Sequence, residues 1–543
     1  MVAKPDSKDV GADAMSISTN LARSTVRQLI ELGIQDVVLS PGSRNAPLSL
    51  AFYHAEKKGL IRLHIRIDER SAAFFALGIT KATGKYVPVV CTSGTAVANY
   101  YPAVLEAHHS DLNLLLLTAD RPAHLRKTGS NQTTLQSHIF GEFVRHSVDS
   151  AAPIEVSHLL SGSGPVHINL QFDEPLLPED SREWLDGVHI NPPSRGTKTG
   201  RDLKLTSARN VLIVGHDRAG FSIQEIEDFA LKVAAPIIAE DPLSFSHSVA
   251  HAPVIFSDER SRQALIPDSL FVIGRTTLSR TVNHYIKESP KVIVIDPRAE
   301  NIDSARSADL VLHQLPKISS VVTRDDQWFA TWEKYESLAT QAVSSLTEWN
   351  EPSALAQIAK EIEGDTALFI SSSRPIRDIE SFAQPRSGVT TYANRGLAGI
   401  DGNISTVFGI ATEFESNYAI LGDLTFLHDI SALTNKTDKN VRIYVINNNG
   451  GGIFSTLSQA GVENFESLFG TPHNLDLVKV CEGFQVKAKS VSNLDQLQAL
   501  NNQPVKGLEV VIVEVPNREI NAKILRDLTQ RVSSAVRIGI NLA

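Results

Sequence analysis

Short apolar runs alternate with amphipathic stretches along most of the chain. Leu21, Val26 and Leu29 recur at helical spacing, and Gly33 follows at a position where a helix commonly ends. The apolar run at 36–39 then fits a short buried strand. This order of helix and strand returns repeatedly, which predicts parallel sheets with helices on both faces.

The first third of the chain carries the elements of one such unit. Residues 61–67 alternate apolar and basic positions with a period of two, which predicts a strand with two different faces. Residues 71–83 are rich in Ala and Phe and end at Gly84, which indicates a helix. The other predicted elements are strands at 87–91, 112–118 and 165–170 and a helix at 96–107.

Two further α/β units follow. A Pro- and Gly-rich polar stretch at 191–200 predicts a linker, and Glu351-Pro352-Ser353 resembles a helix start after a polar helix at 327–348. We therefore expect a flexible tail at 1–15 and three domains, at 16–190, 200–348 and 352–543. Their predicted strands lie at 210–214, 235–238, 270–273 and 292–295, then at 367–370, 418–421, 441–446 and 508–513.

The composition narrows the class of protein. Hydrophobic residues make up 42%, no apolar run reaches 18 residues, and the polar N-terminus lacks the apolar core of a secretory signal, so we expect a cytoplasmic protein. A net charge of −9 argues against a nucleic-acid or membrane partner. The two cysteines exclude a disulfide scaffold. Met15 stands where the pattern begins, which leaves Met1 and Met15 as alternative starts.

In the last third of the chain, polar residues follow two of the predicted strands. Gly422-Asp423 ends one strand, and Asn447-Asn448-Asn449 with three glycines ends another, so that Asn448 follows Asp423 by 25 residues. Carboxyl ends of parallel strands face the ligand crevice, where a carboxylate and an amide oxygen would converge. Such hard oxygen ligands suit Mg²⁺, which often bridges to phosphates. Each half alone fits an ordinary turn, but the combination favours a metal–diphosphate site.

The N-terminal unit has a similar set of strand ends. The polar segments at 40–44, 68–70, 92–95 and 118–122 each follow a predicted strand, which places them in one crevice. Taken alone, Asp68-Glu69 is better explained as a helix N-terminus, where acidic charge is favourable.

Together these motifs resemble the thiamine-diphosphate-dependent enzymes. They resemble most closely the 2-succinyl-5-enolpyruvyl-6-hydroxy-3-cyclohexene-1-carboxylate synthases of menaquinone biosynthesis, the MenD family. The resemblance runs from about residue 16 to about residue 460 and is weaker in the central domain and beyond. The matching segments are Ser-Pro-Gly-Ser-Arg at 40–44, Asp-Glu-Arg at 68–70, residues 92–99, 117–122, 131–132, 394–396, 399–402 and 447–454.

The resemblance implies an α/β fold of three doubly wound parallel-sheet domains: pyrimidine-binding, central and diphosphate-binding. It implies a transferase that decarboxylates 2-oxoglutarate and adds the resulting unit, at the level of succinyl semialdehyde, to isochorismate. The cofactors would be thiamine diphosphate and Mg²⁺ or Mn²⁺, in a homodimer or homotetramer with active sites between subunits. The alternatives are another thiamine-diphosphate carboligase, such as an acetolactate-synthase-like enzyme using pyruvate, and an inactive homologue.

The resemblance also assigns residues to the cofactor. Glu69 would be catalytic, because a carboxylate at the aminopyrimidine ring nitrogen assists proton transfer. Asp423, Asn448 and the Gly450 carbonyl would hold the metal, and Ile400 would be the apolar wedge that keeps the two cofactor rings folded together. The remaining expected cofactor contacts are Ser93, Gly94, Gly399, Gly422, Ile453 and Phe454.

Both expected substrates carry two carboxylates, which arginine binds better than lysine. Since the chain is acidic overall, the arginines must be concentrated locally. The family often has Lys-Arg where this chain has Ser279-Arg280, so Arg280 is the weakest match. The expected substrate ligands are Ser43, Arg44, Arg121, Asn131, Gln132, Arg280, Ser373, Arg377 and Arg395.

Overall fold

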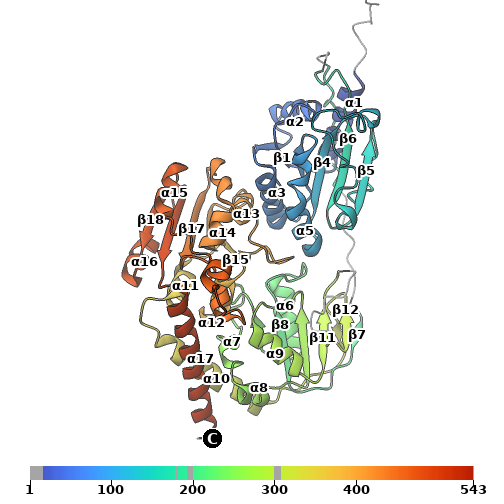
Figure 1. The fold of residues 1–543 in the computed structure, drawn as a ribbon. Helices are drawn as coiled ribbons and strands as arrows, with labels where there is room; N and C mark the ends of the chain where they lie inside the picture. The colour runs from blue at the N-terminus through green and yellow to red at the C-terminus, as the bar shows by residue number, and fades with distance from the viewer. Residues whose placement is uncertain (1–15, 179, 181, 193–199, 299–306, 542–543) are drawn as a thin grey trace, which may run out of the picture. The chain divides into compact units, whose positions relative to one another are not determined.

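A computed structural model of the chain describes residues 16–178, 180, 182–192, 200–298 and 307–541 (Figure 1). The predicted tail at 1–15 and most of the predicted linker at 191–200 lie outside the described residues. The chain divides into two compact units, Met1–Arg195 and Gly196–Ala543. The predicted α/β fold with three doubly wound parallel sheets is confirmed, one sheet in the first unit and two in the second.

The first unit is built on six parallel strands in the order β2-β1-β3-β4-β6-β5. The chain runs from β1 to β2 on one side and then to β3 on the other, so the sheet switches direction beside β1. The strands are β1 (Asp36–Leu39), β2 (Arg62–Ile65), β3 (Val87–Cys91), β4 (Leu114–Asp120), β5 (His146–Ser150) and β6 (Val166–Gln171). The helices are α1 (Ile17–Glu31), α2 (Ala46–Lys57), α3 (Glu69–Thr83), α4 (Thr95–Ala98), α5 (Tyr101–Ser110), η1 (Ala123–Leu125) and η2 (Gly141–Phe143).

Local signals explain most of these bounds. The Asp68 side chain caps α3 by accepting a hydrogen bond from the Ser71 backbone N–H at 3.3 Å, and Gly84 ends the helix in the left-handed conformation. The single helix predicted at 96–107 is wrong, because the chain forms α4 and α5 there. Pro102 sits in the first turn of α5 and has no backbone N–H to continue a helix from α4.

The second unit contains a five-stranded sheet in the order β12-β11-β10-β8-β9 and a six-stranded sheet in the order β15-β14-β16-β17-β19-β18, besides the pair β13-β7. Its strands are β7 (Asp202–Leu203), β8 (Asn210–Val214), β9 (Ile237–Ala239), β10 (Ser269–Ile273), β11 (Val292–Ile295), β12 (Leu310–Leu312), β13 (Lys317–Ile318), β14 (Thr366–Ile370), β15 (Val389–Tyr392), β16 (Ser416–Gly422), β17 (Asn440–Asn447), β18 (Lys487–Val491) and β19 (Leu508–Glu514). Its helices are α6 (Ile223–Lys232), α7 (Ala252–Ile255), α8 (Glu259–Ala264), α9 (Arg280–Glu288), α10 (Asp326–Ser344), α11 (Glu351–Glu361), α12 (Arg374–Phe382), α13 (Asn403–Ile410), α14 (Asp423–His428), α15 (Leu477–Gly483), α16 (Leu494–Asn501) and α17 (Arg518–Asn541), with the short turns η3 (Ile430–Thr434), η4 (Gly452–Thr456) and η5 (Glu466–Gly470).

The C-terminal helix α17 packs against the middle of the chain (Figure 1). Leu528 and Val532 of α17 share one buried cluster with Trp328 and Trp332 of α10. This packing joins the two large sheets of the second unit into one compact body. The domain boundary near 348–352 stays a prediction. Within the part of the chain that the structure describes, no helix is long and apolar enough to cross a membrane.

Candidate active site

Four neighbouring strands of the first unit end in polar residues. Arg44 follows β1, Glu69 follows β2, Ser93 follows β3 and Arg121 follows β4. Because β2, β1, β3 and β4 are consecutive in the sheet, their carboxyl ends lie at one edge. The structure thus brings these strand ends together, as the sequence predicted.

Glu69 is the first residue of α3 and its side chain is half-buried. Its Oε2 accepts a hydrogen bond from Asn99 Nδ2 at 3.3 Å. A carboxylate at a helix N-terminus is stabilised by the helix dipole. Glu69 is therefore a half-buried carboxylate that is oriented by its hydrogen bond with Asn99. The proposed proton transfer needs a carboxylate that is fixed in position.

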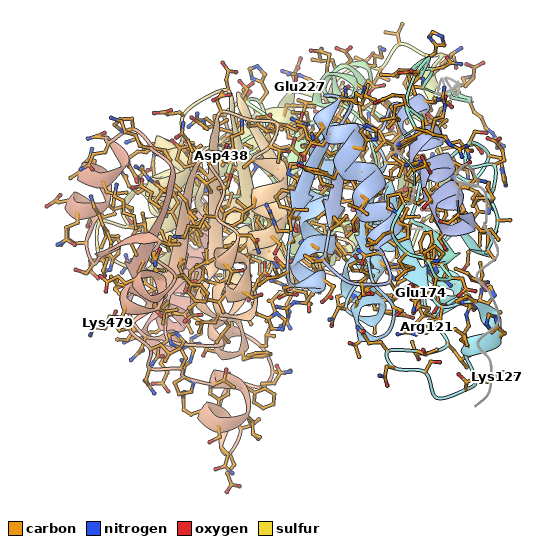
Figure 2. The ribbon with its side chains drawn as sticks, turned by 90° about the horizontal axis from the view of Figure 1, so that it is seen from above. Arg121, Lys127, Glu174, Glu227, Asp438 and Lys479 are labelled. Atoms are coloured by element: carbon orange, nitrogen blue, oxygen red, sulfur yellow. The ribbon has the colours of Figure 1, made fainter. Side chains whose placement is uncertain are left out.

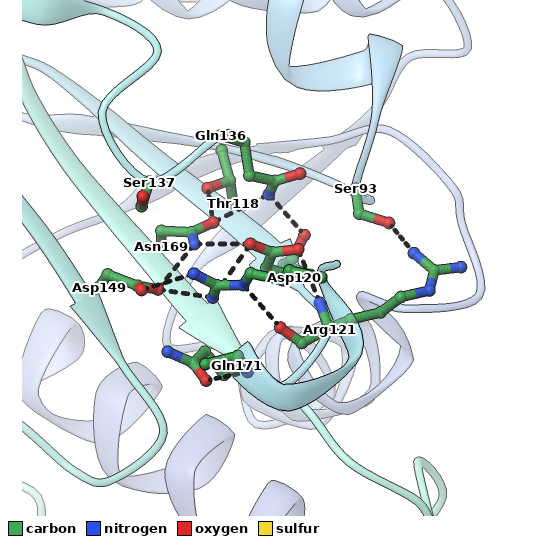
Figure 3. Close-up of polar contacts among 12 residues, drawn as sticks. Ser93, Thr118, Asp120, Arg121, Gln136, Ser137, Asp149, Asn169 and Gln171 are labelled. Carbon is green, nitrogen blue, oxygen red and sulfur yellow. Dashed lines mark hydrogen bonds and ion pairs between the residues drawn. The ribbon is translucent and has the colours of Figure 1, made fainter. Parts of the chain in front are cut away.

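Arg121 ties the turn after β3 to a second predicted segment. Its Nη1 donates to Ser93 Oγ at 2.6 Å (Figure 3). The same Nη1 donates to the Gln132 carbonyl at 2.8 Å. Gly94 has φ +89°, and a Cβ there would lie 3.3 Å from the Gln132 carbonyl oxygen, so only glycine suits this turn. Residues expected at the cofactor and at the substrate therefore form one cluster.

A second arginine lies near this cluster. Arg44 donates from Nη1 to the Phe172 carbonyl at 2.9 Å and lies 3.6 Å from the Glu174 carboxylate. Burial, and then the positive charge of Arg44, lower the pKa of Arg121, so an anion between them would relieve their repulsion. Figure 2 labels Arg121 and Glu174 at the same end of this unit. Ser43 and Asn131 have exposed side chains.

The second unit brings Asp423 and the glycine loop together. Asp423 begins α14 after β16, is 2% exposed, and its Oδ2 accepts a hydrogen bond from the Gly450 backbone N–H at 2.7 Å. Gly450 has φ +131°, and a Cβ there would lie 2.0 Å from the Gly470 carbonyl oxygen. No other residue fits this position without moving the chain.

The oxygen atoms of this loop fit a hard divalent cation. Asn448 Nδ2 donates to Glu351 Oε2 at 3.4 Å, whereas the buried Asn448 Oδ1 has no hydrogen-bond partner among the described residues. A buried amide oxygen without a partner is unfavourable unless a ligand occupies it. Groups of three or more His, Cys, Asp or Glu placed for a metal are absent from the described residues. A Mg²⁺ site relies on few carboxylates and takes phosphate or water oxygens.

A pocket of about 580 Å³ in the second unit is lined by four arginines. Arg374 forms an ion pair with Asp378, whereas Arg280, Arg377 and Arg526 form none within the ranges that the structure describes. Burial and the neighbouring charge of Arg374 lower the pKa of Arg377. Ile453, expected beside the cofactor, also lines the pocket.

Arg395 occupies a different environment. Its Nη2 lies 2.9 and 3.0 Å from the two carboxylate oxygens of Glu240, and both side chains are buried. Glu240 also accepts the backbone N–H groups of His216 at 2.9 Å and Leu278 at 2.7 Å. Arg395 lines a smaller cavity of about 230 Å³. Its positive charge is thus largely neutralised by Glu240, and its role as a substrate ligand stays a prediction.

The other predicted residues occupy loops or helix ends. Ser373 precedes α12 with φ +74°, and its carbonyl accepts a hydrogen bond from Arg377 Nη1 at 2.6 Å. Gly399 and Ile400 are half-buried before α13, and Gly422 caps α14. The Phe454 ring lies 5.6 Å from the Phe469 ring.

The sequence interpretation missed several residues of these sites. Arg374 lies three residues before Arg377, a spacing that places both on one side of a helix and could have been noticed. Glu240 follows a predicted strand, and its place at a strand end could have marked it as a candidate site residue. His473, whose Nε2 lies 3.3 Å from Asp423 Oδ2, and Arg526 come from segments without a matching motif.

Comparisons with known proteins agree with this geometry. Residues 19–140 match the family model of the thiamine pyrophosphate enzyme N-terminal TPP-binding domain. A 2-succinyl-5-enolpyruvyl-6-hydroxy-3-cyclohexene-1-carboxylate synthase from a Nocardioides species is 36% identical, over 95% of this chain and 97% of its own length. The chain belongs to this family. Another MenD-family synthase, from Bacillus cytotoxicus, is 32% identical over 93% of this chain and 94% of its own length.

The solved structures confirm the fold. Benzoylformate decarboxylase from Polynucleobacter necessarius aligns with a TM-score of 0.66 at 16% identity, covering 92% of this chain and 98% of that chain. This MenD-family member is therefore a thiamine-diphosphate-dependent enzyme that uses a divalent metal. The relatives favour the MenD interpretation over the acetolactate-synthase-like alternative.

Proposed function

We propose that this enzyme decarboxylates 2-oxoglutarate and adds the resulting unit to isochorismate, giving 2-succinyl-5-enolpyruvyl-6-hydroxy-3-cyclohexene-1-carboxylate. The observation that carries the proposal is the arginine-lined pocket of about 580 Å³ in the second unit. Its only carboxylate among the lining residues, Asp378, is already paired with Arg374. A pocket with surplus positive charge suits substrates with several carboxylates better than pyruvate, which has one.

The cofactor contacts follow from the two half-sites. When bound, thiamine diphosphate supplies a nucleophilic carbon that attacks a 2-oxo acid, and its ring accepts the electron pair that remains when CO₂ leaves. Glu69 would hold a proton at the aminopyrimidine nitrogen. Asp423, Asn448 Oδ1 and the Gly450 carbonyl would hold Mg²⁺ or Mn²⁺. The other proposed contacts are Ser93, Gly94, Gly399, Ile400, Gly422, Ile453 and Phe454.

The substrate contacts divide between the two units. Ser373, Arg377 and Arg395 would bind 2-oxoglutarate. Arg377 is a stronger candidate than Arg395, because Arg395 is paired with Glu240 whereas Arg377 forms no ion pair with a described residue. The remaining proposed substrate ligands are Ser43, Arg44, Arg121, Asn131, Gln132 and Arg280.

The assembly is part of the same proposal. Glu69 lies in the first compact unit and Asp423 in the second, and we propose that one cofactor is held between subunits of a homo-oligomer. The domain boundaries at 16–190, 200–348 and 352–543 and a cytoplasmic location belong to this proposal as well.

The test is turnover with both substrates. The purified enzyme is incubated with 2-oxoglutarate, isochorismate, thiamine diphosphate and Mg²⁺, and loss of isochorismate is followed. Glu69→Gln should lose most of the turnover while its fold survives, whereas the exposed Glu142→Gln should keep it. Absence of turnover in the wild type would overturn the function. A near-normal kcat in Glu69→Gln with unchanged cofactor affinity would overturn only the role of Glu69.

A further inference from the structure

The buried amide of Gln136 connects three strand ends beneath the Ser93-Gly94 turn. Gln136 is 1% exposed, and its Oε1 accepts a hydrogen bond from the Gly94 backbone N–H at 3.1 Å. Its Nε2 donates to the Ala119 carbonyl at 3.0 Å and to Asn169 Oδ1 at 2.9 Å. One side chain therefore joins the turn after β3 to β4 and β6. Figure 3 shows its contact with Asn169.

The neighbouring residues fix which way this amide points. Asn169 Nδ2 donates to Asp120 Oδ2 at 3.0 Å and to Asp149 Oδ1 at 2.8 Å. Carboxylates accept and cannot donate, so the nitrogen of Asn169 must face them and its oxygen must face Gln136. Gln136 then presents its nitrogen to Asn169 and its oxygen to Gly94. The orientation is set by the charges of two aspartates and is not free to reverse.

The same network also reaches Arg121. Asp120 Oδ1 accepts a hydrogen bond from the Arg121 backbone N–H at 2.7 Å, and the Arg121 guanidinium returns to Ser93 Oγ at 2.6 Å. The turn is thus fixed by two hydrogen bonds, from the Gly94 backbone N–H to Gln136 and from Arg121 to Ser93 Oγ. The neighbouring Gln132 has φ +53°, a conformation that a residue with a side chain keeps only when the surrounding contacts fix it.

We propose that Gln136 is a positioning residue that sets the Ser93-Gly94 turn for the cofactor and, through that turn, the guanidinium of Arg121 for a substrate carboxylate. The inference rests on the proposed roles of Gly94 and Arg121. Gln136 itself is buried and acts only through the groups it holds.

The experiment compares Gln136→Met with a matched control. Methionine keeps the length of the side chain and removes its hydrogen bonds. Asn113→Leu is the control, because Asn113 is buried before β4, at the opposite end of the same sheet, and donates to the Gly84 carbonyl at 2.8 Å. Three quantities are measured in each protein: hydrogen exchange of the Gly94 amide, the melting temperature, and kcat and KM for both substrates.

Gln136→Met should speed exchange of the Gly94 amide by about tenfold or more, the effect of losing one buried hydrogen bond. KM for the substrate held by Arg121 should rise by a similar factor. Asn113→Leu should lower the melting temperature comparably, with exchange at Gly94 and KM unchanged. If Gln136→Met resembles Asn113→Leu in exchange and KM, the positioning role is wrong.

Gln136→Glu provides a second variant of the same shape. Its ionised carboxylate still accepts from Gly94 but opposes the oxygens of Ala119 and Asn169, and protonation restores one donor. KM in this variant should therefore fall towards the wild-type value as pH is lowered, and an unchanged KM across pH would contradict the role. An inactive wild type with a normal exchange response at Gly94 would overturn the proposed function and leave the positioning of the turn intact.

Discussion

Replacing Arg377 by Ala should remove recognition of the distal carboxylate of 2-oxoglutarate at little cost in stability. The Arg377 guanidinium donates one hydrogen bond, to the Ser373 carbonyl at 2.6 Å, and makes no ion pair with any residue that the structure describes. Burial and the charge of Arg374 lower its pKa. The charges of Glu240 and Glu380 act on Arg377 in the opposite direction, but neither forms an ion pair with it among the described residues, so its guanidinium is available to an anion.

The magnitude follows from the contact that is lost. A charge-assisted hydrogen bond contributes about 1.5–3 kcal/mol. Removing it should lower kcat/KM for 2-oxoglutarate by about 10- to 150-fold, since about 1.4 kcal/mol corresponds to a factor of ten. Pyruvate has no distal carboxylate and should lose much less. The free energy of unfolding should fall by no more than about 1.5–3 kcal/mol, the value of one charge-assisted hydrogen bond, because removing Arg377 also removes its repulsion with Arg374.

Arg395→Ala provides the contrast. It leaves the buried Glu240 carboxylate without its guanidinium partner, which typically costs about 3–5 kcal/mol of stability. A loss of activity in Arg395→Ala would therefore combine two effects, the loss of folded protein and the loss of substrate recognition. The double variant Arg395→Ala/Glu240→Gln removes the unpaired charge and should recover much of the stability. Any remaining change in substrate preference would then belong to Arg395.

The assay is kcat/KM for 2-oxoglutarate and for pyruvate in the wild type, Arg377→Ala and Arg377→Lys, with melting temperatures in the same buffer. The kcat/KM of Arg377→Lys for 2-oxoglutarate should lie between those of the wild type and Arg377→Ala, because lysine keeps the charge but cannot make a bidentate contact. An unchanged ratio of the two kcat/KM values in Arg377→Ala would refute the assignment of the distal carboxylate to Arg377.

Three further predictions concern other parts of the molecule. Asp423→Ala should weaken thiamine diphosphate binding, and EDTA should inactivate the wild type until Mg²⁺ or Mn²⁺ is restored; full activity in metal-free buffer would contradict the metal site. Burial lowers the pKa of His167 to about 3, so the folded protein keeps this side chain neutral where the unfolded chain would protonate it. The free energy of unfolding should therefore fall by about 1.4 kcal/mol per pH unit as the pH drops from 6.5 towards 3, and His167→Gln should flatten this slope in unfolding titrations. Mixing inactive Glu69→Gln and Asp423→Ala proteins should restore activity in mixed dimers if sites are shared between subunits, and verified mixed dimers without rescue would exclude sharing.

The sequence predicted the fold where the signal was local. The buried central strand β3 is a continuous apolar run, and β17 is apolar from Val441 to Ile446 except for Arg442. Their ends located Ser93, Asn448 and the glycine loop. The strand β5 was missed, because its sequence is polar and its positions are half-exposed at the sheet edge.

Contacts between distant segments were beyond the sequence pattern. Glu240 lies 155 residues from Arg395, and neither periodicity nor a local motif shows that they pair. The same holds for Arg526, which reaches the arginine pocket because α17 folds back on the middle of the chain. Such placements depend on tertiary packing and become visible only in the folded molecule.

The central claim is that a dicarboxylic keto acid supplies the unit transferred to isochorismate. The most direct measurement is a competition in which the enzyme receives isochorismate, thiamine diphosphate, Mg²⁺ and equal amounts of 2-oxoglutarate and ¹³C-labelled pyruvate, and the product is weighed by mass spectrometry. We predict a product with the mass of 2-succinyl-5-enolpyruvyl-6-hydroxy-3-cyclohexene-1-carboxylate and no label. A product that carries the pyruvate label, or none containing isochorismate, would contradict the claim.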